Sequence, residues 1–298
     1  MISIIITTYK REAEILERAI KSAISQTIED KEIIVVNDFP EYKEIVEAVV
    51  DKYPEVQLIS HSSREGACKS RNDGAAIAKG EYLAFLDDDD EWENDKLDIQ
   101  KKAALQYDAD LVYCGGIGIN DITGETRELD FIKPCLNDDY YKILLSENII
   151  GGCSFPLLSR RAFSVLGGFD EELQASQDLE LWLRFSKSYK IHYIDKKLVI
   201  YHLGNISIST NIDKKMQGYR RLYNKHVDEY RENPQSAYKY LKMVNREAIM
   251  FSNKEYIKEV IRYSKDYSLS IRIKLLVYTC INYIYKHTIK RSELRVSR

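Results

Sequence analysis

The sequence predicts an α/β protein with a mainly parallel sheet, flanked by helices and followed by a helical extension. Over residues 1–116, short β-branched and aliphatic runs alternate with longer segments whose apolar residues recur at helical spacing. This order implies parallel strands joined by right-handed crossovers. In addition, polar residues gather directly after three of the strand-like runs, where sheets of this class bind their ligands.

Five strands and four helices account for the first part of the chain. The strands are expected at 2–9, 32–38, 56–60, 81–87 and 109–116, because each is a short run dominated by apolar residues. The helices are expected between them, at 12–26, 42–53, 66–80 and 93–107.

The second part of the chain is organised differently. The alternation fails between 121 and 175, where short strand-like pieces and turns predict a segment that shapes substrate binding. An amphipathic helix is expected at 176–189, with Ser176 as its N-cap, followed by strands at 190–194 and 197–203. From Asp213 onward the pattern is helical, with a break at Pro234.

Composition indicates an ordinary globular protein: of 298 residues, 44% are hydrophobic and 31% charged. Five widely spaced cysteines without a CxxC pair favour reduced thiols in a cytoplasmic protein over a zinc site: Cys68, Cys114, Cys135, Cys153 and Cys280. The N-terminus lacks the pattern of a signal peptide. The longest uncharged stretch near the C-terminus, Leu275 to Tyr285, is shorter than the ~20 residues of a membrane-spanning helix.

Polar side chains follow the first, second and fourth predicted strands. They are Thr7 to Arg11, Asn37 with Asp38, and the four acids Asp87 to Asp90. Because the carboxyl ends of parallel strands share one edge of a sheet, these clusters are expected on one side of the molecule. Carboxylates at this edge favour a nucleotide bound together with Mg²⁺ or Mn²⁺, which prefer hard oxygen ligands.

Four consecutive acids repel one another, so they are expected to take different roles. Asp87 and Asp89 are two residues apart, which lets both face a cation or a sugar hydroxyl. Asp88 is expected to point elsewhere, and Asp90 to open the following helix, where negative charge is favourable. The alternative interpretation is a solvated acidic loop with no ligand.

The sequence does not match the motifs of several other sites that use clustered acids or bind phosphates. An EF-hand loop counted from Asp87 needs Gly and Glu where Trp92 and Asp98 stand. A Rossmann dehydrogenase needs G-x-G-x-x-G after the first strand, where TTYKRE stands, and no P-loop occurs. An aspartyl phosphatase would need a small hydroxylated or β-branched residue at Glu91. No nucleic-acid partner is expected, because no recognition motif occurs.

Four segments in order carry a family resemblance: SIIITTYKRE, EIIVVND, GACKSRNDGAAIAKGEYLAFLDDDDEW and GGFDEELQASQDLELWLR. With them, residues 2–210 resemble the family-2 glycosyltransferases, inverting enzymes of the GT-A fold. The resemblance implies sugar transfer from a nucleotide-diphosphate sugar, usually a UDP-sugar, with Mn²⁺ or Mg²⁺. It also implies a catalytic domain over 1–210, with a nucleotide-binding half (1–116) and an acceptor-binding half (117–210), and a helical extension over 211–298.

On the nucleotide side, the resemblance implies that Thr7 and Tyr9 wall the nucleotide and that Asp38 hydrogen-bonds the base. Arg71 would lie near the base and the phosphates. The chain has Asn37 where the family often has a further acid, which alters contacts to the base or ribose. The alternative interpretations are that Asp38 is a turn residue before Pro40 and that Arg71 is a surface salt-bridge partner.

On the chemical side, Asp87 and Asp89 match the DxD pair of the family, with Asp89 expected as the direct metal ligand. Asp88, between them, is counted among the donor-binding residues. Asp178 matches the general base, and His202 loosely matches a histidine that approaches the metal or the diphosphate. Without the resemblance, Asp178 reads as a helix N-terminal charge and His202 as a buried structural histidine.

The residue types suit an inverting transfer. One carboxylate, that of Asp178, accepts the proton of the acceptor hydroxyl as the new bond forms. A second acid is unnecessary because the leaving group is a nucleoside diphosphate, whose charge the metal stabilises. The chain has Gln177 where the family usually has Glu, which removes one neighbouring charge.

Two other functions stay open. A sugar-nucleotide nucleotidyltransferase would show a Gly-rich loop with Arg and Lys after the first strand, and TTYKRE has no glycine. A catalytically silent nucleotide-sugar binding protein would bind without turning over. The expected acceptor is a glycan or a lipid-linked saccharide of bacterial surface polysaccharide synthesis. Trp92 and Trp182 are expected in the core, and Lys10, Arg11 and Lys69 in solvent.

The C-terminal tail concentrates positive charge. From Ile271 to Arg298 there are seven Lys or Arg against one acid, Glu293, whereas the whole chain carries −3. One interpretation is a helical packing or homo-oligomer element. The other is peripheral contact with the anionic inner face of the plasma membrane.

Overall fold

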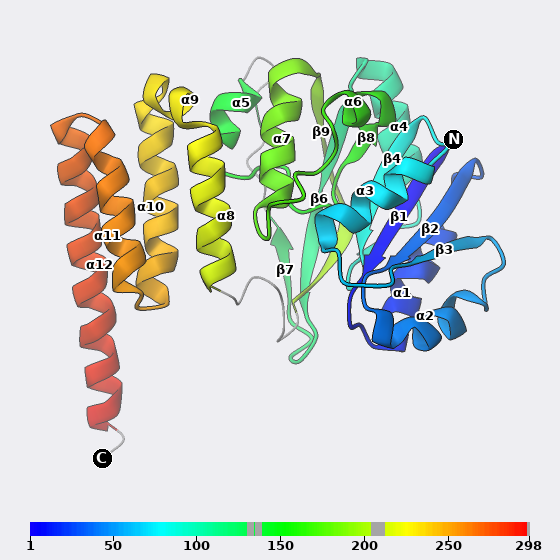
Figure 1. Ribbon diagram of the computed structural model, residues 1–298, viewed down its shortest axis with the longest axis horizontal. Helices are drawn as coiled ribbons and strands as arrows, with labels where there is room; N and C mark the ends of the chain where they lie inside the picture. Colours follow the sequence, from blue (N-terminus) through cyan, green and yellow to red (C-terminus); the bar gives the residue numbers. More distant parts are fainter. Residues whose placement is uncertain (130–133, 135–138, 204–211, 297–298) are drawn as a thin grey trace. The chain divides into compact units, whose positions relative to one another are not determined.

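The computed structural model describes all residues except 130–133, 135–138, 204–211 and 297–298, and side chains as far as Lys286. Two compact units result (Figure 1): Met1–Tyr140 with Ile149–Ser207, and Tyr141–Asn148 with Ile208–Arg298. The second unit therefore includes a short internal segment besides the C-terminal region. The expected division of the first unit into a nucleotide-binding and an acceptor-binding half stays a prediction.

The first unit is built on a nine-stranded sheet. Four parallel strands stand in the order β3 (Val56–Ser60), β2 (Lys31–Asn37), β1 (Ile2–Thr8) and β4 (Tyr82–Asp87). Beyond β4 follow β8 (Leu157–Ser159), β6 (Leu111–Asn120), β9 (Ile191–Leu203) and β5 (Glu91–Trp92), and β7 (Thr126–Leu129) pairs with β6. β8 is antiparallel to both its neighbours, whereas β6 and β9 are parallel. The predicted α/β class is confirmed, as a mixed sheet.

Helices cover both faces of this sheet (Figure 1). On one face, α1 (Ala13–Ile24), α2 (Lys43–Val50) and α4 (Lys96–Tyr107) share a core with the strands, in which Leu16 and Leu97 pack with Ile4. On the other face lies α3 (Ala67–Ile77), whose Gly74 approaches β1 so closely that a Cβ would stand 2.6 Å from Ile5 Cγ2. Small residues in α3 therefore set its distance from the sheet.

The segment from 121 to 175 contains regular elements that the sequence did not reveal. In the described part of this segment they include, besides β7 and β8, the helices α5 (Tyr140–Leu144) and α6 (Arg160–Val165), each of six residues or fewer. α7 (Gln177–Ser188) matches the expected helix. Ser176 stands at the N-cap position, as predicted, with φ of +58°, although its side chain makes no capping hydrogen bond among the described residues.

The two strands expected at 190–194 and 197–203 form one strand, β9. Its register against β6 shifts between Cys114 and Gly116, so residues 195, 196 and 198 are absorbed as an irregularity. Such bulges accommodate extra residues without ending the pairing of the two strands. The polar residues Asp195 to Lys197, which resemble a turn in the sequence, therefore continue the strand.

The second unit is helical, as predicted from Asp213 onward. Its helices are α8 (Ile212–Lys225), α9 (Val227–Glu232), α10 (Pro234–Met250), α11 (Lys254–Tyr263) and α12 (Leu269–Val296); the chain's 3₁₀ turns include η1 (Pro40–Tyr42) in the first unit and η3 (Ser264–Asp266) in the second. Pro234 is the first residue of α10, where its missing N–H breaks no bond. Tyrosine rings fill the centre: Tyr230 lies 5.3 Å from Tyr223 and 5.0 Å from Tyr240, between centroids.

Two observations bear on the class of protein. Among the described residues, no helix combines the length and apolar character needed to cross a bilayer. The cysteines that the structure describes are free thiols, and Cys135 lies outside the described residues: Cys68, Cys114, Cys153 and Cys280.

Candidate active site

The three polar clusters predicted from the sequence meet at one edge of the sheet. Thr7 of β1 stands opposite Asp87 of β4, and Thr8 stands opposite Asn37 of β2. The backbone N–H of Asp38 donates to the carbonyl of Thr8 at 2.9 Å. Parallel register therefore brings the ends of β1, β2 and β4 together, as the order of elements predicts.

Arg11 holds two of the four consecutive acids. Its Nε donates to Asp88 Oδ1 at 2.9 Å, and its Nη2 donates to Asp89 Oδ2 at 2.8 Å. The N–H of Tyr9 also points to Asp88 Oδ2, at 3.4 Å. The expectation of a solvated Arg11 is wrong, because acids 77 and 78 residues later in the chain fold against it. Asp88 is buried and shares Arg11 with Asp89, so the prediction that Asp88 points away from Asp89 is not confirmed.

Arg71 joins the acidic loop to the start of α7. Its Nη2 donates to Asp87 Oδ1 at 2.7 Å and its Nη1 to Gln177 Oε1 at 3.0 Å. Asp178, the next residue, lies in the first turn of α7 and is partly exposed. Burial raises the pKa of Asp178, the Leu179 N–H and Arg71 oppose this rise, and the charge of Asp87 adds to it. Arg71 thus joins Asp87, one acid of the expected metal-binding pair, to the residue beside the expected base.

The negative charge of the loop is only partly balanced. Burial, and then the charge of Asp88, raise the pKa of Asp89 to about 6, although Arg11 acts in the opposite direction. Burial, followed by the charges of Asp87 and Asp89, raises the pKa of Asp90. The loop is therefore short of positive charge even with Arg11 and Arg71 in place.

Asp90 is a buried member of the loop and not a helix opener. It is 1% exposed, its Oδ2 accepts a hydrogen bond from Ser154 Oγ at 2.6 Å, and its Oδ1 has no side-chain hydrogen-bond partner among the described residues. The prediction that Asp90 opens the following helix is wrong, because β5 comes next and α4 begins only at Lys96.

The acids fit a divalent cation that binds together with a phosphorylated ligand. The side chains of Asp87 and Asp89 are 30% and 35% exposed, and an arginine holds one oxygen of each. Within the described ranges, no three His, Cys, Asp or Glu side chains gather into a metal cage. Mg²⁺ commonly takes one or two carboxylates and completes its shell with water and substrate phosphates. Asp87 and Asp89 supply such a partial set.

His202 is placed differently from its expected role. Its Nε2 lies 2.8 Å from Glu91 Oε1, and its Nδ1 lies 2.5 Å from Asp121 Oδ1. Both ring nitrogens are thus engaged, so metal ligation by His202 would require one of these contacts to open. The geometry agrees with the alternative interpretation of a structural histidine, and a ligand role stays a prediction.

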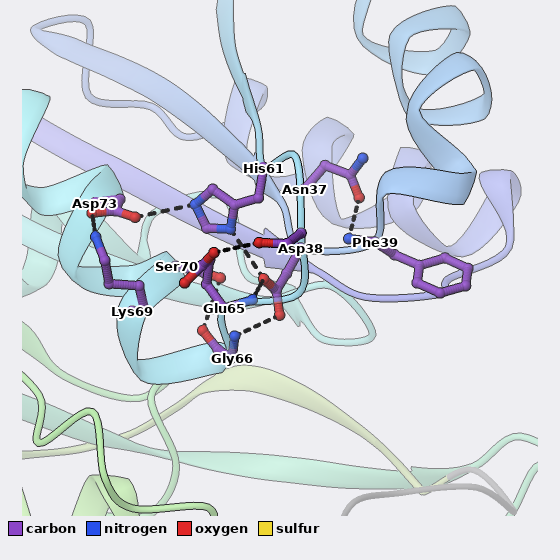
Figure 2. A network of polar contacts seen from close by, with 10 residues as sticks. Asn37, Asp38, Phe39, His61, Glu65, Gly66, Lys69, Ser70 and Asp73 are labelled. Carbon is purple, nitrogen blue, oxygen red and sulfur yellow. Dashed lines mark hydrogen bonds and ion pairs between the residues drawn. The ribbon is translucent and has the colours of Figure 1, made fainter.

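Asp38 is held on both of its carboxylate oxygens (Figure 2). Oδ1 accepts the N–H of Glu65 at 2.7 Å and lies 3.0 Å from His61 Nδ1, and Oδ2 accepts the N–H of Gly66 at 2.9 Å. His61 Nε2 lies 3.1 Å from Asp73 Oδ2. Asp38 therefore fastens the loop before α3 to the end of β2. Its predicted contact with a base stays a prediction.

The sequence did not single out Arg64 as a residue of this region. Arg64 places its guanidinium carbon 4.5 Å from the centroid of the Tyr9 ring, which also packs on Phe39 at 5.1 Å. Tyr9 remains 38% exposed, as a residue that walls a ligand would be. Lys69, expected in solvent, is ion-paired with Asp73. No local pattern marks Arg64 or His61, because their partners lie on other elements.

The two tryptophans are core residues, as expected. Trp92 is 3% exposed and donates to the carbonyl of Ser154 at 2.8 Å. Trp182 is fully buried and donates to the carbonyl of Gly151 at 2.9 Å. Both indoles therefore support the loop that carries Ser154, the partner of Asp90.

Comparison with known proteins relates this site to a sequence family. Residues 3–167 match the model of Glycosyl transferase family 2. The chain is 31% identical over 242 residues to the putative colanic acid biosynthesis glycosyl transferase WcaA of Escherichia coli (strain K12), covering 77% of this chain and 82% of that protein. It is 28% identical over 245 residues to the Escherichia coli UDP-Glc:alpha-D-GlcNAc-diphosphoundecaprenol beta-1,3-glucosyltransferase WfgD, covering 81% and 90%.

Solved structures give the same fold. The crystal structure of S. aureus TarS 1–349 in complex with UDP-GlcNAc superposes with a TM-score of 0.69 at 14% identity, covering 95% of this chain and 89% of that chain. The same fragment in complex with UDP gives a TM-score of 0.59 at 14% identity, over 96% and 91% of the two chains. At this identity the likeness concerns the fold alone, and it confirms the predicted GT-A architecture.

Proposed function

Because the chain belongs to glycosyltransferase family 2, we propose that it is an inverting transferase that moves a sugar from a UDP-sugar to an acceptor hydroxyl with a divalent cation. One observation carries the proposal: Arg71 contacts both Asp87 and Gln177, next to Asp178. Arg71 therefore links an acid expected at the donor phosphates, Asp87, to the helix start that carries the carboxylate expected at the acceptor. The names of WfgD and of the TarS complex, which mention UDP-Glc and UDP-GlcNAc, support a UDP-sugar as the donor.

In the proposed donor complex, Thr7 and Tyr9 line the nucleotide and Asp38 accepts a hydrogen bond from the base. Arg11 and Arg71, already at the edge of the sheet, offer positive charge to the diphosphate. Asp87 and Asp89 would hold Mg²⁺ or Mn²⁺, which when bound stabilises the charge of the departing diphosphate. Asp88 keeps Arg11 in place through its buried carboxylate.

The proposed chemical step is a single in-line displacement. The acceptor oxygen bonds to the anomeric carbon, the bond from that carbon to the diphosphate oxygen breaks, and the hydroxyl proton passes to the carboxylate of Asp178. Burial raises the pKa of Asp178, which favours the protonated product of this step. The start of α7 and Arg71 keep the carboxylate ionised before the reaction, since both favour negative charge.

The proposed acceptor is a glycan or lipid-linked saccharide of bacterial polysaccharide synthesis. Colanic acid biosynthesis in the name of WcaA and a diphosphoundecaprenol-linked sugar in the name of WfgD support this class. A lipid-linked acceptor would bring the reaction to the cytoplasmic face of the plasma membrane.

The test is Asp178→Asn, assayed with a panel of UDP-sugars, Mn²⁺ and acceptor. We expect UDP release in the presence of acceptor to fall by about 10²–10⁴-fold, as for the loss of a general base, with UDP binding unchanged. Asp108→Asn, at an acid that is 92% exposed, serves as the control and should leave release unchanged.

Three other outcomes would contradict the proposal. Unchanged turnover of Asp178→Asn removes the base assignment. Tight binding of one donor without release by the wild-type chain favours the silent binder. Pyrophosphate formation from UTP and a sugar 1-phosphate favours the nucleotidyltransferase.

A further inference from the structure

Helix α12 is fixed to the second unit along one face. Ile271 and Leu275 on this face are buried, and Asn245 Nδ2 of α10 donates to Thr279 Oγ1 at 2.5 Å. About two turns after Thr279, Lys286 Nζ donates to the carbonyl of Ile249, at the end of α10, at 2.7 Å. A cation at a helix C-terminus is favourable, so this contact ties the two helices together. The rotation of α12 about its own axis is therefore set.

The opposite face of α12 is apolar and exposed. Its residues recur at helical spacing, and we name them the outer stripe: Leu269, Ile273, Leu276, Val277, Cys280 and Ile281. Leu269 is 66% exposed, Ile273 50%, Val277 51% and Ile281 61%. At about 100° per residue the stripe is centred roughly opposite Ile271 and Leu275. A contiguous exposed apolar surface of this kind marks an interaction site.

Positive charge borders the stripe on both sides. On the helical wheel, Arg272 and Lys274 lie about 100° to either side of its centre. Beyond Lys274, Lys242 of α10 stands over the ring of Tyr278, 4.9 Å from its centroid. The sequence has no Asp or Glu from Tyr267 to Ser292. The outer stripe is thus an apolar surface between cations.

We propose that the outer stripe of α12 docks on an anionic lipid bilayer, with its apolar side chains among the acyl chains and Arg272 and Lys274 at the headgroups. This combination of an apolar face and flanking cations is what interfacial helices use. A second copy of the chain fits less well, because stripe-to-stripe pairing would bring cation-bordered surfaces together with no acid on this face of the helix to pair with them. Figure 1 shows that α12 continues past the ends of α10 and α11.

Cys280 offers a direct measurement on the stripe. Among the described cysteines it is exposed, whereas Cys68, Cys114 and Cys153 are buried, and Cys135 can be replaced by Ser. An environment-sensitive fluorophore on Cys280 should shift to shorter wavelength with vesicles of phosphatidylcholine and phosphatidylglycerol, and much less with phosphatidylcholine alone. An unshifted spectrum with both kinds of vesicle would overturn the proposal.

Flotation of the unlabelled chain tests the stripe without a label. The variant Ile273→Asp with Val277→Asp should reduce binding to the anionic vesicles by about tenfold or more. The matched control, Leu105→Asp with Ile122→Asp, changes two residues of the first unit that are each 65% exposed and adds the same charge, and it should bind like wild type. Circular dichroism and thermal unfolding check that both variants fold.

Two results, one from flotation and one from flotation combined with a measurement of oligomeric state, would overturn the proposal. Equal losses in the two variants would mean that net charge, and not the stripe, governs binding. A wild-type dimer that the stripe variant dissociates, with vesicle binding unchanged, would assign the stripe to a second copy. All these measurements are made without donor, so their failure leaves the proposed glycosyl transfer untouched.

Discussion

Two groups of acids at the same edge of the sheet differ in how far hydrogen bonds and cations balance their negative charge. Asp38 has both oxygens bonded, to two backbone N–H groups and to His61. In the acidic loop, Arg11 and Arg71 pair with three of the four carboxylates, and the pKa of Asp89 is raised. The fourth carboxylate, that of Asp90, has no arginine partner among the described residues. A satisfied acid stabilises the fold, whereas crowded acids retain electrostatic free energy that a bound cation can lower. The two groups therefore predict opposite responses to substitution.

The largest expected effect is in the acidic loop. Asp89→Asn should lower turnover by about 10³-fold, as when charge stabilisation of a leaving group is lost. The free energy of unfolding should not decrease, because the substitution removes charge from a crowded loop. Donor turnover and urea unfolding measure the two quantities. Lower stability together with unchanged turnover would break the comparison, since it would make this acid structural.

Asp38 should behave in the opposite way. Asp38→Ala leaves the backbone N–H groups of Glu65 and Gly66, together with His61, without this acceptor, which should reduce the free energy of unfolding by about 3 kcal/mol. The exposed acid Glu55 provides the control, and Glu55→Ala should unfold like wild type. Wild-type stability of Asp38→Ala with weakened UDP binding would instead assign Asp38 to the ligand alone.

A buried cation provides a second comparison between paired and unpaired charges. Lys96 is fully buried, with Nζ 2.8 Å from Gln100 Oε1 and 4.2 Å from the centroid of the Trp92 ring, and no carboxylate among these contacts. Burial lowers the pKa of Lys96 from 10.5 to about 8. The charged form therefore destabilises the folded state by about 3 kcal/mol below pH 8. Lys96→Met should stabilise the protein by about 2 kcal/mol at neutral pH, since it also loses two favourable contacts.

The lowered pKa of Lys96 determines how the stability of the wild-type protein changes with pH. Between pH 8 and 10.5 the folded state releases the Lys96 proton before the unfolded state does, so wild-type stability rises with pH relative to the variant. The gap in unfolding free energy between Lys96→Met and wild type should therefore shrink across this range. A gap that is independent of pH would mean that packing, and not charge, accounts for the difference.

The smallest expected effect concerns His61. His61→Gln keeps one donor for Asp38 and loses the contact with Asp73, so it should reduce the free energy of unfolding by about 1 kcal/mol. Turnover at saturating donor should stay near that of wild type, because His61 acts through Asp38. A larger loss than that of Asp38→Ala would place the centre of the network at His61.

The sequence predicted what local pattern determines. The strands and helices of residues 1–116 follow from apolar periodicity, and parallel register then brings Thr7, Asp38 and Asp87 to one edge. It did not predict Arg11 on Asp88 or His61 on Asp38, since these pairs join residues 77 and 23 positions apart. The sequence also did not predict the three-residue strand β8. Its pairing with β4 and β6, and not its intrinsic propensity, makes this segment a strand.

The internal segment Tyr141–Asn148 belongs to the helical unit, whose sequence otherwise begins at Ile208. Tyr141 lies against His226, at 3.3 Å between Oη and Nδ1, and Ser236 Oγ donates to the carbonyl of Lys142 at 3.2 Å. Leu144 and Leu145 are fully buried. The helical unit is thus a discontinuous domain, built from two separate segments of the chain. A truncation after residue 207 would leave two leucines without their native surroundings, so exchanging C-terminal modules between relatives requires grafting the internal segment as well.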